Sequence, residues 1–227
     1  MKNIPLYVKI LVLSLILIAP AVFMLYLYSG NPNYKRLPIL GPRESVTLPD
    51  GTVDTLYHTI PAFSFIDQDS NIVTNKDLEG HIYVADFFFV TCPSICPKMT
   101  TNMNQIYRRI DDFPGLILLS HTVNPEHDSV PVLKEYAEKL DVDSKKWHFV
   151  TGEKDSIYSV AFNGYFVSVG RDSIAPGGFL HSAYFILVDP KGRIRGYYDG
   201  TKYAEVKKLM DAIKILYKEE FVPLKEK

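Results

Sequence analysis

The sequence predicts an α/β fold, with a central sheet flanked by helices, behind a single N-terminal membrane helix. Three observations support this expectation. Residues 10–28 are apolar and uncharged. Beyond residue 60, short segments rich in β-branched and aromatic residues alternate with segments whose apolar residues recur at helical spacing. A hairpin signal precedes the last helical segment, at Pro190-Lys191-Gly192. Together these patterns predict one membrane anchor followed by one α/β domain.

The composition excludes a nucleic-acid-binding surface of the usual kind. The chain has 227 residues, of which 47% are hydrophobic and 22% charged, and its net charge is -1. The first 28 residues contain two lysines and no acid, which leaves 23 basic against 26 acidic side chains in the remainder. A mildly acidic body has no basic field to attract phosphate backbones, so we expect no nucleic-acid partner.

The N-terminal apolar run has the length of a membrane span. At about 1.5 Å per residue it approaches the roughly 30 Å of a hydrocarbon core. Lys2 and Lys9 precede it, so the positive-inside rule predicts a cytoplasmic N-terminus and an extracytoplasmic domain. The alternative is a cleaved signal peptide, but the run is longer than the usual signal and no A-x-A site follows it. We therefore expect a single-pass protein of the inner, cytoplasmic membrane, with its domain on the periplasmic side.

The polar stretch after the anchor contains four prolines that interrupt regular structure: Pro32, Pro38, Pro42 and Pro49. It predicts a stalk with a short hairpin at Pro49-Asp50-Gly51. The expected organisation is an anchor over residues 1–28, a stalk or linker over 29–60 and a globular domain over 61–222.

The domain is expected to alternate strands and helices in a fixed order. Strands are predicted at residues 62–67, 81–90, 116–123, 147–150, 182–189 and 193–198. Helices are predicted at residues 97–110, 130–140, 154–162 and, with Thr201 as N-cap, from there to about residue 220. Strand, helix, strand, then hairpin and helix is the order of a thioredoxin-like fold.

The two cysteines of the chain lie where a buried strand ends and a helix begins, in Thr91-Cys92-Pro93-Ser94-Ile95-Cys96-Pro97. Pro97 suits the first helical position, so Cys92 to Cys96 would form a loop over the helix N-terminus. The positive end of the helix dipole favours thiolates there. Two soft sulfur donors select Cu(I), zinc or an iron–sulfur cluster, and the same pair could close into a disulfide.

At these residues the sequence resembles the Sco/SenC family of cytochrome oxidase assembly proteins. The resemblance covers roughly residues 60–220 and rests on three blocks in order. They are the cysteine motif with the preceding Asp86-Phe87-Phe88-Phe89-Val90, the middle motif Asn124-Pro125-Glu126-His127-Asp128, and the stretch Gly178-Phe179-Leu180-His181-Ser182-Ala183-Tyr184. The family has an acidic residue where this chain has Asn124 and arginine where it has His127. These departures put in doubt any role of that acid in copper loading or docking.

The resemblance implies a copper site formed by Cys92, Cys96 and His181, binding Cu(I) or Cu(II). It also implies a metallochaperone, and not a classical enzyme, that matures the binuclear copper site of cytochrome c oxidase. The expected partners are the copper-bearing oxidase subunit and a thioredoxin-like reductant. The alternatives are a thiol–disulfide oxidoreductase that uses the same cysteines and a peroxide-reducing thioredoxin relative.

Several other residues have a second interpretation. Met99 and Met103 could donate thioethers to Cu(I), but their helical spacing favours a core-facing stripe. The five other histidines are scattered over the chain, so each is expected to be a non-ligand: His58, His81, His121, His127 and His148. Asp86 is either a structural, hydrogen-bonded aspartate or a proton-accepting group near the site.

Overall fold

The computed structural model describes residues 5–29, 36–172, 176–180 and 182–222. His181 of the expected copper site therefore lies outside the described residues. The chain separates into two compact units, Met1–Lys35 and Arg36–Lys227. The first contains helix α1 (Leu6–Ser29), in which the 18 residues from Tyr7 to Met24 have a mean hydropathy of 2.3 and are 0% buried. This helix is long and apolar enough to cross a membrane, although a signal sequence would meet the same test.

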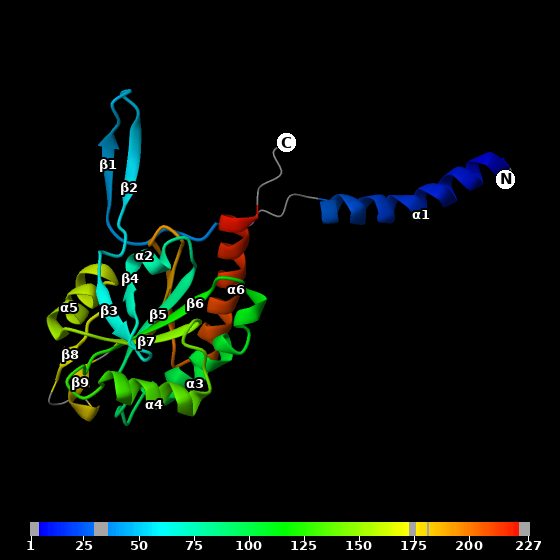
Figure 1. Ribbon diagram of the computed structural model, residues 1–227. Helices are drawn as coiled ribbons and strands as arrows, with labels where there is room; N and C mark the ends of the chain where they lie inside the picture. The colour runs from blue at the N-terminus through cyan, green and yellow to red at the C-terminus, as the bar shows by residue number, and fades with distance from the viewer. Residues whose placement is uncertain (1–4, 30–35, 173–175, 181, 223–227) are drawn as a thin grey trace. The chain divides into compact units, whose positions relative to one another are not determined.

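The second unit is built on a seven-stranded sheet (Figure 1) in the order β11-β10-β5-β6-β7-β3-β4. The three central strands β5, β6 and β7 run parallel, and the strands on either side pair antiparallel. The strands are β3 (Ser64–Asp67), β4 (Ile72–Thr74), β5 (Tyr83–Phe88), β6 (Ile117–Thr122), β7 (Trp147–Thr151), β10 (Tyr184–Val188) and β11 (Ile194–Asp199).

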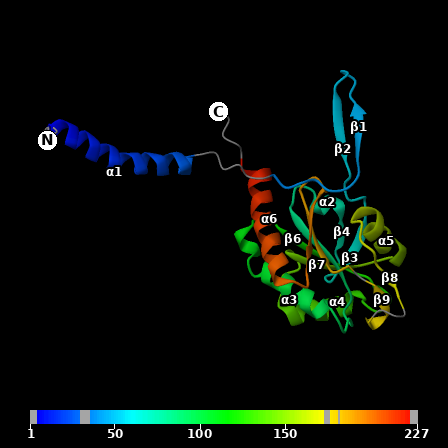
Figure 2. The same ribbon diagram turned by 180° about the vertical axis from the view of Figure 1, so that it is seen from behind.

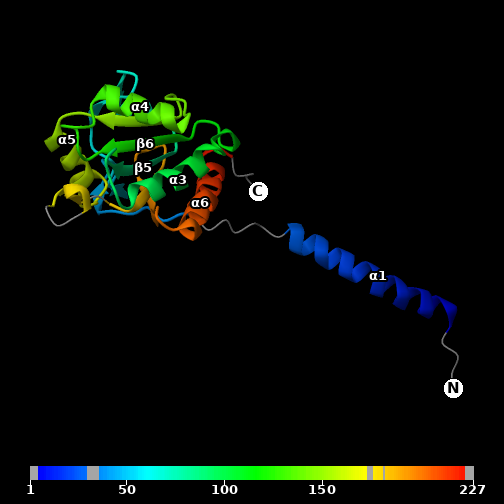
Figure 3. The same cartoon turned by 90° about the horizontal axis from the view of Figure 1, so that it is seen from below.

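Helices cover the sheet and bury its apolar side chains. They are α2 (Asn75–Leu78), α3 (Cys96–Tyr107), α4 (Val130–Leu140), α5 (Lys154–Ser159) and α6 (Tyr203–Phe221), with short turns η1 (Ile110–Asp112), η2 (Val160–Gly164) and η3 (Pro176–Gly178). Helices α3 and α6 lie side by side (Figure 3). The predicted fold class, a central sheet flanked by helices, is confirmed.

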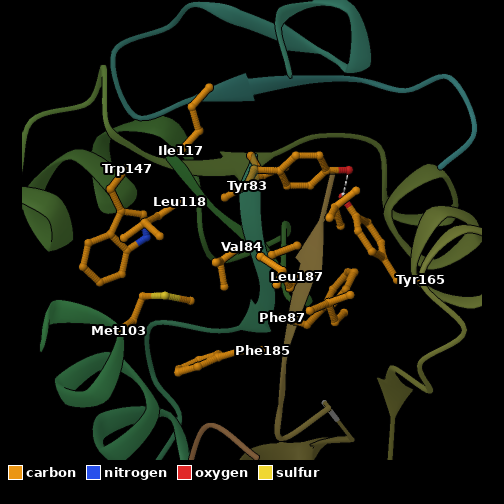
Figure 4. Close-up of a cluster of buried hydrophobic side chains, with 14 of the residues drawn as sticks. Tyr83, Val84, Phe87, Met103, Ile117, Leu118, Trp147, Tyr165, Phe185 and Leu187 are labelled. Carbon is orange, nitrogen blue, oxygen red and sulfur yellow. Dashed lines mark hydrogen bonds between the residues drawn. The ribbon is translucent and has the colours of Figure 1, made fainter. Parts of the chain in front are cut away.

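The two faces of the central strand β5 carry different aromatic clusters. Phe88 stacks on Tyr136 of α4 at 5.5 Å between ring centroids, whereas Phe87 contacts Tyr165, just after η2, at 5.6 Å. Because successive strand residues point to opposite faces, these contacts assign α4 and η2 to opposite sides of the sheet. Figure 4 shows Tyr165 on the side of Phe87, with Met103 and Trp147 on the other side of β5.

A β-hairpin of β1 (Arg43–Thr47) and β2 (Val53–Tyr57) projects from the second unit (Figures 1 and 2). The expected turn at residues 49–51 is confirmed. The chain is attached to the sheet on both sides of this hairpin. Leu40 forms a bridge with Ile194, and the Ile60 amide donates to the Gly192 carbonyl at 2.9 Å.

Arg195 lies in a buried ionic cluster at the edge strand β11. Only 2% of this residue is exposed, and Asp189, at 0%, accepts from it at 3.1 Å. Its guanidinium also donates to Glu219 of α6 at 2.8 Å and to the Leu37 carbonyl at 2.7 Å. The cluster therefore joins the sheet to the last helix and to the segment that precedes the hairpin.

Most predicted elements are present, with shifted ends. Residues 130–140 form the expected helix α4, whereas the expected helix 154–162 divides into α5 and the π-helical turn η2. The prediction that Thr201 caps the last helix was wrong. Its hydroxyl donates to Asp199 at 2.5 Å, and the N-cap is Lys202. Strand β4 and helix α2 were not predicted.

Candidate metal centre

The cysteine loop lies between the end of β5 and the start of α3. The Cys92 amide donates to the Phe89 carbonyl at 3.2 Å, which turns the chain immediately after the strand. Helix α3 begins at Cys96, with Ile95 as N-cap and Pro97 as its second residue. A loop over this helix N-terminus was predicted from the sequence, with Pro97 at the first helical position. In the structure Pro97 occupies the second position. Pro97 has no amide hydrogen, and the Lys98 and Met99 amides donate to the Ile95 carbonyl. A hydrogen bond with the Cys96 amide at this helix end favours the Cys92 thiolate.

The two cysteine side chains are both buried but differ in their acidity. Cys92 is 7% exposed and Cys96 is 2% exposed. Burial opposes ionisation of Cys92, but hydrogen bonds with Cys96 and Ser94 outweigh it and lower the pKa of the Cys92 thiol. Burial raises the pKa of the Cys96 thiol well above its usual range, and the hydrogen bond with Cys92 raises it further. Cys92 is thus the sulfur that ionises first.

The segment that precedes His181 in the chain packs against the cysteine loop. The ring of Phe179 lies 5.2 Å from that of Phe89. Gly177 has φ +82°, and a Cβ atom there would lie 2.8 Å from Phe89 and 2.9 Å from Pro93. Only glycine fits both the backbone conformation and this close approach. The contacts place residues 177–179 against the loop that carries the cysteines.

The donor set on the described residues is a pair of sulfurs. Within residues 5–29, 36–172, 176–180 and 182–222, no group of three or more His, Cys, Asp or Glu side chains is arranged to hold a metal ion. Two thiolates suit a soft ion such as Cu(I), and a further imidazole would complete a site that also suits Cu(II). The family resemblance implies that His181, which lies outside the described residues, is this imidazole.

Asp128 of the middle motif fixes the start of the cysteine loop. Its carboxylate is fully buried and accepts from the Val90 amide at 3.0 Å and from the Thr122 hydroxyl at 2.5 Å. His127 Nδ1 lies 2.8 Å from its other oxygen. The sequence marked this residue only as part of a motif. Its contact with Val90, two residues before Cys92, gives it a place next to the site.

The two methionines of α3 are core residues. Met99 is 1% and Met103 is 0% exposed, and Figure 4 shows Met103 beside Trp147 within the hydrophobic cluster. This burial agrees with the expected packing stripe.

The remaining histidines have contacts outside the cysteine loop. His58 lies 2.8 Å from the Gly164 carbonyl, and His148 lies 3.1 Å from Asp67. His121 stacks on Phe87 with 4.8 Å between ring centroids. Burial lowers the pKa of His121 to about 4, so this imidazole is neutral near pH 7.

Asp86 lies within β5 and is 4% exposed. Burial raises its pKa to about 7, although the Ser120 hydroxyl, which donates to it at 2.5 Å, acts in the opposite direction. Trp147 Nε1 donates in turn to the Ser120 oxygen at 2.9 Å. Of the two interpretations offered by the sequence, this chain of hydrogen bonds favours a structural aspartate.

Comparison with known proteins identifies a family. The family model described as SCO1/SenC matches residues 52–218. A SCO1 protein homolog of Bacillus subtilis is 28% identical over 150 residues, which is 66% of this chain and 78% of that protein.

Two solved structures give the same result. BsSco, described as a Sco-family cytochrome c oxidase assembly protein with a disulfide switch, aligns with a TM-score of 0.63 and 26% identity, over 70% of this chain and 94% of that one. Yeast Sco1 with copper bound aligns with a TM-score of 0.56 and 28% identity, over 75% and 96% of the two chains.

Proposed function

This chain belongs to the SCO1/SenC family, and from that premise we propose that it is a membrane-anchored copper metallochaperone. It binds one copper ion through Cys92, Cys96 and His181 and delivers it to the binuclear copper site of cytochrome c oxidase. The observation that carries the proposal is the packing of residues 177–179 against the cysteine loop. This packing brings the chain that leads to His181 next to the loop holding both sulfurs.

The chemistry of the cysteine pair supports reversible binding of copper as cargo. Metal binding requires both sulfurs as thiolates. The lower pKa of Cys92 provides the first thiolate, and a soft cation would assist ionisation of the more deeply buried Cys96. Transfer then proceeds by ligand exchange, in which thiolates of the acceptor replace those of this site one at a time. The acceptor is the copper-bearing subunit of the oxidase.

The N-terminal helix supports a membrane location. Helix α1 fits a membrane anchor by length and hydropathy. We propose that it crosses the cytoplasmic membrane once, with the N-terminus inside and the copper domain in the periplasm, since lysines precede the apolar run. In this organisation residues 1–28 are the anchor and 61–222 the copper-binding domain; of the proposed linker 29–60, the residues from Arg36 on belong to the same compact unit as that domain.

The second candidate function is that of a thiol–disulfide oxidoreductase acting on the acceptor cysteines. The two thiols have unlike pKa values, as in a pair in which one sulfur attacks and the other resolves. The disulfide switch named for BsSco favours this candidate. A thioredoxin-like reductant would then be a partner, because the pair must be reduced again after each turnover.

Copper stoichiometry separates the two candidates. The purified full-length chain in detergent is reduced, loaded with copper, dialysed against a weak chelator and analysed for metal. One retained copper ion per chain, lost in Cys92→Ser and Cys96→Ser and weakened in His181→Ala, supports the metallochaperone. Fully oxidised protein should take up none, because a disulfide consumes both sulfurs. Retention by the oxidised protein, or no retention by the reduced one, would contradict the proposal. Delivery is tested by incubating the loaded chain with the copper-free oxidase subunit and measuring copper on each partner.

A further inference from the structure

We propose that Glu126 and Asp128 are positioning residues, and that the 124–128 turn holds the cysteine loop and the β8–β9 hairpin at a fixed separation. The hairpin consists of β8 (Gly170–Arg171) and β9 (Phe179–Leu180) and directly precedes His181 in the chain. This inference rests on the proposed copper site. It names the contacts that keep the two parts of that site, the cysteine loop and the hairpin, in place.

One arm of the turn reaches the cysteine loop. Asp128 accepts from the Val90 amide with the same oxygen that accepts from the Thr122 hydroxyl. Since Thr122 is the last residue of β6 and Val90 follows β5, this carboxylate joins the ends of two adjacent parallel strands. A buried carboxylate that accepts from a backbone amide and from a buried hydroxyl has little freedom to move.

The other arm reaches the hairpin. The Glu126 carboxylate accepts from the Arg171 guanidinium of β8 and, at 3.2 Å, from Lys154 of α5. Arg171 pairs with Phe179 across the hairpin, and its guanidinium carbon lies 6.0 Å from the centre of the Phe179 ring. A change at Glu126 would therefore alter the contact of Arg171 with β9, the strand that ends immediately before His181 in the chain.

The turn between the two arms is itself rigid. The Asp128 and His127 amides both donate to the Asn124 carbonyl, at 2.9 and 3.1 Å. The preceding Val123 carbonyl accepts from the hydroxyl of Tyr158 in α5 at 2.9 Å. These hydrogen bonds fix the backbone from which both Glu126 and Asp128 extend, so the turn connects the two contacts.

The β8–β9 hairpin needs such a contact. Its strands are two residues long each and form a separate two-stranded sheet, and an isolated two-stranded hairpin is only marginally stable in water. Among its described residues, Phe179 and Gly177 contact the cysteine loop. The Glu126–Arg171 ion pair adds a polar contact with the 124–128 turn.

The Glu126–Arg171 ion pair should affect the affinity for Cu(II) more than it affects the free energy of unfolding. Both side chains are more than half exposed, and exposed ion pairs contribute little to folding. Imidazole matters more for Cu(II) than for Cu(I), which two thiolates can hold. A displaced hairpin should therefore weaken the binding of Cu(II) more than the binding of Cu(I).

The test is a double-mutant cycle on the reduced full-length chain with Glu126→Gln, Arg171→Gln and the double variant. Dissociation constants for Cu(II) and Cu(I) are measured by chelator competition, together with the thiolate-to-Cu(II) absorption band. Asp111→Asn is the matched control, because it breaks another exposed ion pair between distant segments, Lys146–Asp111, at 2.6 Å. We expect each single variant to weaken Cu(II) binding by up to about fivefold, because an exposed ion pair is worth no more than that, and to shift the absorption band. The double variant should be no weaker than either single variant, and Cu(I) affinity should be unchanged.

Additive effects in the cycle, an equal loss for both oxidation states, or a Glu126→Gln variant identical to Asp111→Asn would overturn the inference. In those cases wild-type copper uptake would still support the proposed function. Failure of the reduced wild-type chain to hold copper would contradict the proposed function instead, and the inference with it.

Discussion

Two fully buried carboxylates, Asp128 and Asp189, lie at opposite ends of β5 and are stabilised in different ways. Asp189 follows β10, whose last residue pairs with Tyr83 at the start of β5, whereas Asp128 reaches Val90 beyond the end of that strand. Two arginines compensate Asp189, with Arg193 Nε at 2.8 Å and Arg195 Nη1 at 3.1 Å. Asp128 relies on a backbone amide, a hydroxyl and the imidazole of His127.

The difference indicates different purposes for the two ends. The arginine cluster joins three distant segments, because Arg195 also contacts Glu219 and the Leu37 carbonyl. Its partners lie away from the cysteine loop. The Asp128 contacts join the ends of β5 and β6, and the contact with Val90 reaches the start of that loop. We therefore expect the Asp189 end to matter most for the stability of the fold and the Asp128 end to matter most for the cysteine loop.

The largest expected effect on stability is at the arginine end. Arg195→Met leaves its carboxylate partners without this cation, and removal of one member of a buried ion pair costs about 3 to 5 kcal/mol. Urea unfolding of the variant, followed by circular dichroism, should show this loss. The variant should still retain one copper ion at low temperature. Loss of copper binding by a folded Arg195→Met protein would remove the distinction between the two ends.

Asp128→Asn should cost less stability and affect copper more. The amide group of asparagine brings a donor to a site where Val90 and Thr122 already donate, and an unsatisfied buried polar group costs about 1 to 3 kcal/mol. The loop that carries Cys92 should shift, so the dissociation constant for Cu(II) should rise. Parallel unfolding and chelator-competition measurements check both effects. A variant with wild-type copper affinity would show that the loop does not depend on this carboxylate.

Two buried titratable groups, Asp86 in β5 and His121 in β6, should make the free energy of unfolding depend on pH. In the folded chain the pKa of Asp86 is about 7, above its ordinary value, so unfolding free energy should fall as pH rises from about 4 to 7, by roughly 1.4 kcal/mol per unit of pKa difference. His121 has a folded pKa of about 4, below its ordinary value, so its contribution is lost as pH falls from about 6.5 to 4. The two trends oppose each other between pH 4 and 6.5.

Asp86→Asn should therefore reveal the His121 trend. The variant should become more stable as pH rises from 4 to 6.5, whereas the wild type should change less over the same range. Urea unfolding at half-unit pH steps measures both curves. Parallel curves for the two proteins would mean that Asp86 does not hold its proton in the folded chain.

The smallest effect is expected on the α3 side of the sheet, away from both carboxylates. Met99→Leu and Met103→Leu conserve volume and should each cost less than about 1.5 kcal/mol. Both variants should bind copper as tightly as the wild type. A large loss of Cu(I) affinity in either one would identify a thioether ligand and contradict the packing interpretation.

Local patterns explain which elements could be predicted from the sequence. The aromatic and β-branched residues of segment 83–88, which is interrupted by Asp86, and the following Pro97 indicate a buried strand, a loop and a helix start, and the cysteine loop is found there. Thr74 and Asp77 form a capping box, with the Thr74 amide donating to Asp77 at 2.8 Å. This short-range pattern could have revealed helix α2. Thr201 was misassigned because the same side-chain type also binds a preceding carboxylate.

The contacts around the site could not be predicted in the same way. Glu126 and Arg171 are 45 positions apart, and neither lies in a periodic pattern that would indicate its partner. The Asp128–Val90 contact spans 38 positions. Such pairs depend on how strand ends converge in space. The family resemblance therefore indicated that residues 124–128 matter, whereas the structure indicated what they contact.

The β1–β2 hairpin is a self-contained insertion. The chain leaves the sheet after Leu40, beside Ile194, and returns at Ile60, beside Gly192, so its exit and entry points lie two residues apart on the same edge. A hairpin whose two ends lie this close together can change in length or sequence at little cost to the stability of the rest of the fold. A change of this kind would leave the contacts of the cysteine loop in place, so the hairpin is a position where another sequence could be attached to the domain.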